Sequence, residues 1–352
     1  MWAMKDIKVG GKWIGQNHRP FIIAEMSGNH NQSLERALQI IDAAADSGVD
    51  ALKIQTYKAE TMTLDITEGD FYINDDKSLW KGRSLYELYE EAHTPWEWHK
   101  AIFDHCKKRN VLCFSTPFDT TAVDFLEELE VPFYKIASFE NTDIPLIKKV
   151  AQTGKPMIIS TGMASVSELE LSVKTARNNG CKDIILLKCT STYPADPSNT
   201  NISTIKHMRE LFGVQVGLSD HTMGIGVACA SVAFGATVVE KHFTLSRAEG
   251  GVDSAFSLEP AELKSLVIET ERAWQSLGQV TYGCAKNEEK SKAFRRSIYI
   301  CDDLKAGDIL TEKNLRCIRP GFGLPPKHYE RLIGQKVKKE VKKGTPMKFE
   351  FI

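Results

Sequence analysis

Eight short apolar segments recur between residues 21 and 243, and stretches with helical periodicity, such as 34–46 and 120–130, separate them. The apolar segments are residues 21–26, 51–56, 111–116, 133–138, 156–161, 183–189, 215–220 and 238–243. Parallel strands read as continuous apolar runs because helices bury both faces of their sheet. Eight strand–helix alternations therefore predict an α/β fold, a (β/α)8 TIM barrel.

Charged and polar residues interrupt these apolar segments close to their C-terminal ends. They are Glu25, Lys53, Lys135, Lys188, Asp220, His221, Glu240, Lys241 and His242. The active site of a TIM barrel lies at the C-terminal ends of its strands. We therefore expect these residues to gather at the active site.

Three segments lie outside the repeated strand–helix units of the expected barrel. Residues 1–20 are expected to form a hairpin over the bottom of the barrel. The insertion at residues 57–94 is rich in aromatic and charged residues, and long loops in compact domains are usually functional. Helical signals resume at Thr94 and Pro95, a suitable N-cap and first helical residue. A further helix is expected over residues 260–277, since acidic residues occupy its first turn.

The chain changes character after residue 278. Residues 1–278 hold the expected barrel, residues 279–296 are polar and indicate a linker, and residues 297–352 carry short β-like runs separated by turns. A domain of about 55 residues buries little surface by itself. We therefore expect a homodimer in which this small domain covers the barrel mouth of the partner chain.

Composition narrows the functional classes. The chain has 352 residues, 42% hydrophobic and 26% charged, with a net charge of −1, so binding to nucleic acid or to an anionic membrane is not expected. No apolar run reaches the ~18 residues of a membrane span, and the first residues do not resemble a secretory signal. The eight cysteines form no C-x-x-C pair, which favours buried, reduced thiols and a cytoplasmic location.

Two histidines are the leading candidates for metal binding. His221 and His242 end the seventh and eighth expected strands, which are neighbours in a barrel. Two imidazoles leave coordination positions open for water and substrate oxygens, as a catalytic metal requires. Glu25 and Glu240 would then act as bases or orient the ligands. The alternatives are histidines that only cap loops and carboxylates that only form structural ion pairs.

Two lysines predict an anion site. Lys53 and Lys135 end the second and fourth expected strands, and ammonium groups near hydroxyls suit a phosphate or carboxylate. The hydroxyl residues at other strand ends are Thr116, Ser138, Ser160 and Ser219. A Schiff-base lysine is the rival interpretation. In the small domain, Arg319 lies beside Pro320 and Gly321, so it is either solvated or carried on a rigid loop into a neighbouring active site.

Together these motifs resemble the nonulosonic acid synthase family, whose best-known members make sialic acid. The resemblance covers nearly the whole chain and rests on IIAEMSGNHNQSLERA, LKIQTY, FSTPFD, YKIAS, ISTGM, GLSDHT, VEKHFT and the RPGFGLPP of a C-terminal SAF (antifreeze-like) domain. It implies condensation of phosphoenolpyruvate with the open-chain aldehyde of an N-acetylated amino sugar. The products would be a nine-carbon 2-keto acid and phosphate, released by C–O cleavage, with Mn2+ or Mg2+ polarising the aldehyde.

The resemblance also implies a role for each matching residue. The metal would lie on His221 and His242, and Glu25 would be the acid–base residue with Asp220 and Glu240 in support. The implied phosphoenolpyruvate contacts are Lys53, Thr116, Lys135, Ser138 and Ser219. The implied sugar contacts are Glu140, Tyr193 and Asp253, with Arg319 supplied by the other subunit of a domain-swapped homodimer.

Within the family, the sequence most resembles pseudaminic acid synthases. The likeness lies in AEMSGNHNQSL, WKGRSLYELYEEAHTPWEWH and YKIASFE, and Ser191 stands where the sialic type usually carries Asn. The implied sugar is 2,4-diacetamido-2,4,6-trideoxy-L-altrose. The alternatives are an N-acetylneuraminate, legionaminate or spore-coat sugar acid synthase with the same chemistry, a Schiff-base aldolase, and a carbohydrate-binding protein without catalysis.

Overall fold

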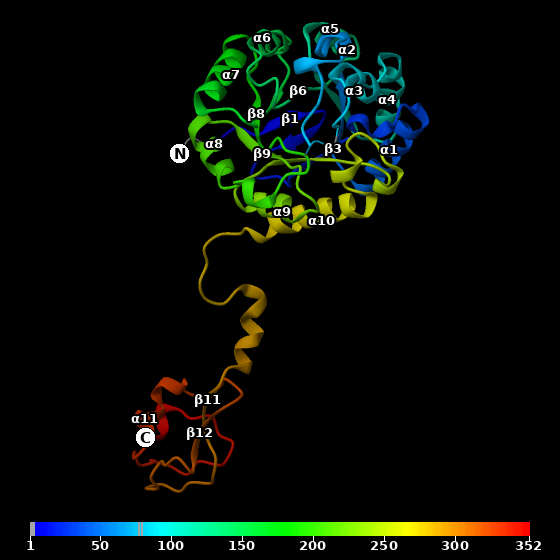
Figure 1. Ribbon diagram of the computed structural model, residues 1–352. Coiled ribbons are helices and arrows are strands. Elements are labelled where there is room, and N and C mark those ends of the chain that lie inside the picture. Colours follow the sequence, from blue (N-terminus) through cyan, green and yellow to red (C-terminus); the bar gives the residue numbers. More distant parts are fainter. Residues whose placement is uncertain (1–3, 77, 79) are drawn as a thin grey trace. The chain divides into compact units, whose positions relative to one another are not determined.

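Eight parallel strands close into a barrel in the computed structural model, which describes residues 4–76, 78 and 80–352 (Figure 1). The strands are β3 (Phe21–Glu25), β4 (Ala51–Thr56), β5 (Leu112–Pro117), β6 (Tyr134–Ile136), β7 (Met157–Ser160), β8 (Ile184–Cys189), β9 (Gln215–Ser219) and β10 (Val238–His242). Each pairs with the next along the chain, and β10 pairs with β3. The predicted TIM barrel is confirmed. Residues 1–3 of the predicted extension and residues 77 and 79 of the predicted insertion lie outside the described residues.

Helices surround the barrel strands (Figure 1). The α-helices of this part are α1 (Leu34–Ser47), α2 (Ala59–Met62), α3 (Leu85–Ala92), α4 (Trp96–Lys108), α5 (Thr120–Glu128), α6 (Ile144–Gln152), α7 (Val166–Asn178), α8 (Thr204–Phe212), α9 (Gly226–Ala233) and α10 (Pro260–Ser276). The 3-10 helices of this part are η1 (Ser27–His30), η2 (Gly69–Phe71), η3 (Pro197–Asn199), η4 (Arg247–Glu249) and η5 (Ser254–Phe256). Within the described residues, no helix is long and apolar enough to cross a membrane.

The helix ends follow local chemistry. The Ser33 side chain accepts a hydrogen bond from the backbone N–H of Arg36, which caps α1, and Gly48 ends that helix at φ 86°, a conformation that glycine adopts at little cost. Helix α4 begins one residue later than the sequence predicts, because Pro95 is the N-cap. Thr94 is instead buried beside the Nε2 atom of His30, at 3.4 Å.

Side chains that point into the barrel form apolar layers below a polar layer. In β3 the inward residues are Phe21, Ile23 and then Glu25, because side chains alternate between the two faces of a strand. The same alternation places Ala51 below Lys53 in β4. The polar layer thus lies at the C-terminal ends of the strands, on a solid apolar floor.

A hairpin adds to that floor, as the sequence predicts. Strands β1 (Ile7–Val9) and β2 (Lys12–Ile14) pair antiparallel, and their apolar side chains pack against the lower core of the barrel. Near the lower strand ends, buried Asp50 accepts hydrogen bonds from Lys12 and Arg19.

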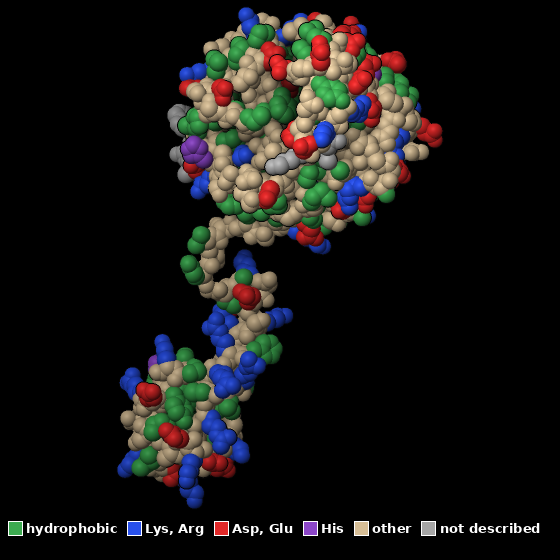
Figure 2. All heavy atoms as spheres, in the orientation of Figure 1, with side chains coloured by type: hydrophobic (Ala, Val, Ile, Leu, Met, Phe, Trp, Pro, Cys, Tyr) green, Lys and Arg blue, Asp and Glu red, His purple; other side chains and the backbone are tan. Residues whose placement is uncertain are grey.

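The chain divides into two compact units, residues 1–278 and 279–352. The second contains η6 (Lys286–Phe294), the antiparallel strands β11 (Ser297–Ile300) and β12 (Leu315–Ile318), η7 (Pro326–His328), α11 (Tyr329–Leu332) and η8 (Phe349–Phe351). It has its own buried core, which includes Ile298, Leu315 and Met347, so the expectation of little core is wrong. Lys and Arg side chains gather over this unit (Figure 2): it has 17 of them against 9 Asp and Glu, whereas residues 1–278 have 28 against 37.

Candidate active site

The C-terminal ends of the strands enclose a polar cavity of about 60 Å³, the inner chamber. Its lining residues are Glu25, Lys53, Gln55, Thr116, Phe118, Lys135, Ala137, Ser138, Ser160, Cys189, Tyr193, Ser219, His221, Glu240 and His242. Every strand of the barrel, or the residues directly after it, contributes at least one of these side chains. Both predicted lysines, both predicted histidines and all four predicted hydroxyl residues therefore share one cavity.

Glu240 is the centre of a buried ionic cluster. Its Oε1 atom accepts hydrogen bonds from Lys53 Nζ at 2.9 Å, Lys135 Nζ at 3.3 Å and Ser219 Oγ at 3.0 Å. Lys53 Nζ also lies 3.1 Å from Glu25 Oε2. Glu240 Oε2, Thr116 Oγ1 and Ser160 Oγ are buried without a hydrogen-bond partner in the protein. The two hydroxyl groups and the two ammonium groups can donate hydrogen bonds to an anionic, oxygen-rich ligand, whereas the unpartnered carboxylate oxygen of Glu240 can only accept one.

Burial and charge push the two carboxyl groups in opposite directions. Burial raises the pKa of Glu25 to about 7, although Lys53 partly opposes this shift. Burial also disfavours the charged form of Glu240, but Lys135 and Lys53 outweigh it and hold that pKa well below its usual range. Glu240 is thus a fixed anion near neutral pH, whereas Glu25 can gain or lose a proton.

The two lysines also differ from each other. Burial opposes the charge of Lys53, but Glu240 and Glu25 outweigh it and raise the pKa of Lys53. For Lys135, burial prevails over Glu240 and lowers the pKa.

The two histidines face one another at the edge of the inner chamber. Their ring centroids are 5.3 Å apart. His221 Nδ1 lies 2.9 Å from the carbonyl oxygen of Thr190, which can only accept, so Nδ1 carries a proton, and Nε2 has a free lone pair when the ring is neutral. Burial opposes the charged form of His221, but Cys189 outweighs it and raises the pKa of His221. His242 Nδ1 is buried without a hydrogen-bond partner and lies 3.9 Å from Asp253 Oδ2. Burial lowers the pKa of His242, which keeps it neutral, as a metal ligand must be.

No group of three or more His, Cys, Asp or Glu side chains suited to hold a metal occurs among the residues that the structure describes. The donors at this position are the two imidazoles, with Asp253 nearby. Two nitrogen ligands beside a substrate cavity fit a divalent cation that keeps positions for water and substrate.

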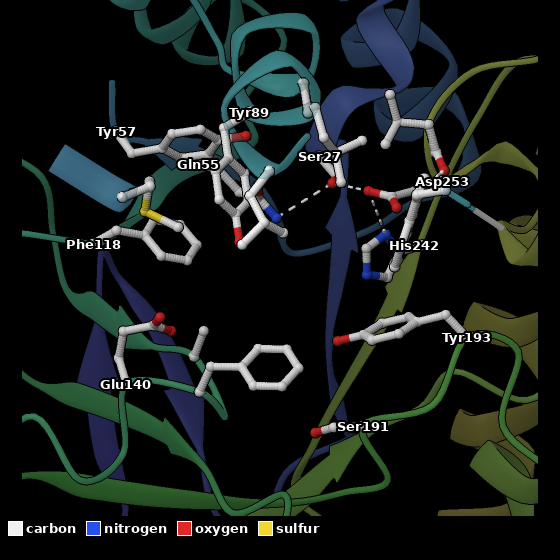
Figure 3. Close-up of a pocket in the computed structure, with 18 of the residues that line it drawn as sticks. Ser27, Gln55, Tyr57, Tyr89, Phe118, Glu140, Ser191, Tyr193, His242 and Asp253 are labelled. Atoms are coloured by element: carbon white, nitrogen blue, oxygen red, sulfur yellow. Dashed lines mark hydrogen bonds and ion pairs between the residues drawn. The ribbon is translucent and has the colours of Figure 1, made fainter. Parts of the chain in front are cut away.

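An outer chamber of about 440 Å³ lies next to the inner one, and the two share Gln55, Phe118, Ala137, Tyr193 and His242. Its other lining residues are Ser27, Tyr57, Met62, Ile73, Trp80, Leu85, Leu88, Tyr89, Ala92, Phe139, Glu140, Ser191, Val252 and Asp253. Figure 3 shows the aromatic rings of Tyr57, Tyr89 and Tyr193 around this space. The predicted sugar residues Glu140, Tyr193 and Asp253 all line it, and so does Ser191.

The insertion supplies much of the outer chamber wall, from Tyr57 to Ala92. Trp80 reaches across it, since its Nε1 atom donates to the carbonyl oxygen of Val252 at 3.2 Å and its ring lies 6.1 Å from that of Tyr193. Tyr86 belongs to the same insertion but does not line the chamber.

A chain of hydrogen bonds joins the two chambers, and Figure 3 shows its part from Gln55 through Ser27 to Asp253. Gln55 Nε2 donates to Glu25 Oε1 and to Ser27 Oγ, both at 3.2 Å, and Ser27 donates in turn to Asp253. Gln55 therefore links the titratable carboxyl group of the inner chamber to the outer chamber.

Asp220, Lys188 and Lys241, which the sequence also predicts at the active site, line neither chamber. Asp220 faces away from the cavity and forms a buried ion pair with Lys241, because it alternates with the inward-facing Ser219 and His221. Lys188 is also outside the cavity lining, and its Nζ donates to the carbonyl oxygen of Cys189. Arg319 is exposed in the second compact unit.

Sequence reasoning missed Gln55 and Cys189. Gln55 follows Lys53 by two residues in β4 and so shares its inward face. Cys189 was expected to be a small apolar core residue, yet its Sγ atom lies 3.9 Å from His221 Nδ1. Strand alternation would have identified both positions.

Comparison with known proteins shows the family of this chain. The profile of the NeuB family matches residues 40–282, and that of the SAF domain matches residues 295–352. The chain belongs to the NeuB family. It is 43% identical over 328 residues to the pseudaminic acid synthase of Campylobacter jejuni subsp. jejuni serotype O:2 (93% of this chain, 95% of the relative). It is 41% identical over 329 residues to the pseudaminic acid synthase of Helicobacter pylori (93% and 96%).

A solved structure is similar as well. The crystal structure of N-acetylneuraminic acid (sialic acid) synthetase from Leptospira borgpetersenii serovar Hardjo-bovis in complex with citrate aligns with a TM-score of 0.73 at 34% identity. The alignment covers 82% of this chain and 95% of that one. The predicted family and the predicted SAF domain are confirmed, and the chain is an enzyme of the NeuB family.

Proposed function

We propose that this chain is a pseudaminic acid synthase, which condenses phosphoenolpyruvate with 2,4-diacetamido-2,4,6-trideoxy-L-altrose to give pseudaminic acid and phosphate. Identities of 41–43% to pseudaminic acid synthases, over 93% of this chain, support this assignment. The observation that carries it is the pair of connected chambers, one cationic and polar and the other apolar and aromatic.

The inner chamber suits phosphoenolpyruvate. Lys53 and Lys135 supply positive charge, and Thr116, Ser138 and Ser160 supply hydroxyl groups around it. A small molecule with one phosphate and one carboxylate needs such a set of donors. Because apolar layers close the inner chamber from below, the sugar would reach the bound molecule from the outer chamber.

The outer chamber suits a deoxygenated, acetylated sugar. Met62, Leu85 and Leu88 offer apolar surface to methyl groups, while Glu140 and Asp253 offer acceptors to hydroxyl and amide groups. Burial raises the pKa of Glu140 to about 7.

His221 and His242 would hold a divalent cation, Mn2+ or Mg2+, which when bound draws electrons from an aldehyde oxygen. The reaction forms a bond between the enol carbon and the aldehyde carbon, adds water at the second carbon of phosphoenolpyruvate, and releases phosphate by C–O cleavage. Glu25 is placed to move a proton, since its pKa lies near neutrality and Gln55 fixes its orientation. Lys53 and Glu240 hold their charges throughout.

The Schiff-base aldolase is the weaker candidate. A lysine nucleophile must lose its proton, and the lowered pKa of Lys135 is the one feature in favour. Against it, Lys135 donates to a permanent anion, Glu240, and a second lysine shares that anion. A sister synthase with another sugar, such as N-acetylneuraminate synthase, is a further candidate, and the 34% identity to the sialic acid synthetase supports it less than the 41–43% identities support a pseudaminic acid synthase.

We also propose a homodimer in which the SAF domain of one chain covers the chamber mouth of the other and contributes Arg319. The opposite charges of the two units support an association between a basic SAF domain and an acidic barrel.

Phosphate release tests the proposed function. Purified protein is incubated with phosphoenolpyruvate, Mn2+ and a panel of amino sugars, and free phosphate is measured. Release should require a sugar and should stop after exhaustive chelation. Release without any sugar, or full activity after chelation, would contradict the proposal.

A further inference from the structure

The residues directly before the two histidines, Asp220 and Lys241, form a buried ion pair that the catalytic proposal does not use. Side chains alternate along each strand, so Ser219 and His221 point inward while Asp220 points outward. On the neighbouring strand, Glu240 and His242 line the inner chamber while Lys241 does not. The side chains of Asp220 and Lys241 are both 0% exposed, and Nζ lies 2.9 Å from Oδ2.

Lys241 does more than neutralise Asp220. Its Nζ also donates to the carbonyl oxygens of Thr222 at 2.6 Å and Gly224 at 2.8 Å. An ammonium group has three donors, and all three are used. Two of these three bonds go to backbone atoms of the loop between β9 and α9, which is the loop that carries His221.

The loop has additional supports. The Asp220 side chain accepts from the backbone N–H of Thr222 at 3.0 Å, and the Asp220 N–H donates to Glu240 O at 2.9 Å. The His221 carbonyl oxygen accepts from Ala195 N at 3.0 Å. Lys241 directly precedes His242 in β10, and its side chain binds the loop that carries His221. It therefore connects the backbone segments of the two histidines.

We infer that Lys241 is a positioning residue that sets the His221 loop relative to His242 and thereby determines how well the two imidazoles bind a divalent cation. The inference rests on the proposed metal site. Groups that orient metal ligands typically change metal affinity by about 10-fold to 100-fold when they are removed.

The test measures Mn2+ affinity directly, by electron paramagnetic resonance of free Mn2+, in the full-length protein. In the Lys241→Met variant the dissociation constant should rise about 10-fold to 100-fold over wild type. That variant also leaves Asp220 buried without its partner, so its folding is checked by thermal unfolding. In the double variant Asp220→Asn/Lys241→Met the unpaired charge is gone, and thermal stability should recover, but the loop carbonyls still lack their donor and affinity should stay low.

Asp50→Asn is the matched control. Asp50 is a buried charge held by Lys12 and Arg19 near the lower strand ends, so its loss should lower stability without changing Mn2+ affinity. Unchanged affinity in both Lys241 variants, or an equal loss in the control, would overturn the role of Lys241. A wild-type protein that does not bind Mn2+ would overturn the metal site itself, and the inference with it.

Discussion

Glu25 is the carboxyl group of the inner chamber that can gain or lose a proton near neutral pH. Its raised pKa, about 7 against a usual 4.5, arises from burial, and Gln55 and Lys53 hold it in place. The folded protein therefore binds this proton more tightly than the unfolded chain does. The stability that this provides is complete below pH 4.5 and is lost as the pH rises through 7.

This argument predicts the stability of a Glu25→Gln variant. Gln has a similar shape and does not titrate, so the variant should gain stability relative to wild type as the pH rises from 4.5 to 8. The expected change is about 3 kcal/mol, at roughly 1.4 kcal/mol per pKa unit. Urea unfolding across this pH range measures it. A stability difference that does not depend on pH would show that Glu25 titrates normally.

Lys53 and Lys135 should bind phosphoenolpyruvate without forming an imine. Borohydride treatment with substrates present should leave both lysines unmodified in mass spectrometry, and a trapped adduct on either would revive the aldolase. Replacing Lys135 by Met should lower kcat/KM for phosphoenolpyruvate by about 10-fold to 100-fold, because a charged hydrogen bond contributes about 1.5–3 kcal/mol. Lys188→Met is the control, since Lys188 lies outside the cavity lining and should leave kcat/KM unchanged.

At this scale, a place at the end of an apolar segment predicts that a residue lies near the active site but not its face, which follows only from alternation with a residue known to point inward. Lys53, Lys135 and His242 end apolar segments and do line the inner chamber. Asp220 and Lys241 end such segments too, yet they face outward, because a shift of one residue reverses the side of a strand.

Among the elements, the insertion between β4 and α4 has the clearest functional consequence. It supplies α2, α3 and the segment around Trp80 to the outer chamber wall. The sequence predicts a functional insertion but not its place, since contacts such as that between Trp80 and Val252 join residues far apart in the chain.

Trp80 should therefore determine how well the sugar binds. Its replacement by Ala removes a large apolar surface beside Tyr193, and kcat/KM for the diacetamido sugar should fall on the order of 10-fold or more. Tyr86→Ala is the matched control, because Tyr86 lies in the same insertion outside the chamber lining. Equal effects of the two replacements in a steady-state assay would mean that the insertion acts through stability instead.

The strands were the most predictable elements. Buried parallel strands have a strong apolar signature, and all eight lie within a residue or two of their expected places. The core of the SAF domain was not predicted. Its apolar residues, such as Leu304, Leu310 and Val341, are spread through turns and lack a helix or strand period.

At the scale of the whole molecule, the two units carry opposite net charges. We expect association of two chains to weaken as salt is raised, since screening reduces attraction between exposed charges. Sedimentation of the full chain at low and high ionic strength measures this.

The proposed dimer makes a sharper prediction about Arg319. Arg319→Ala chains and His221→Ala chains are each expected to be inactive alone. When they are co-expressed, a mixed dimer would have one complete site if Arg319 acts on the partner chain, so activity should return. If Arg319 acts within its own chain, no site is complete and mixing restores nothing.

The most direct test of the proposed function is a competition for limiting phosphoenolpyruvate. Equal amounts of 2,4-diacetamido-2,4,6-trideoxy-L-altrose and N-acetylmannosamine are supplied together, and mass spectrometry gives the ratio of the two nine-carbon acids. Burial of the C6 methyl group contributes about 1 kcal/mol, and an unsatisfied C6 hydroxyl costs about 1–3 kcal/mol. The product ratio should therefore favour pseudaminic acid on the order of 10²-fold. Equal amounts of the two acids, or an excess of the N-acetylmannosamine product, would contradict the assignment.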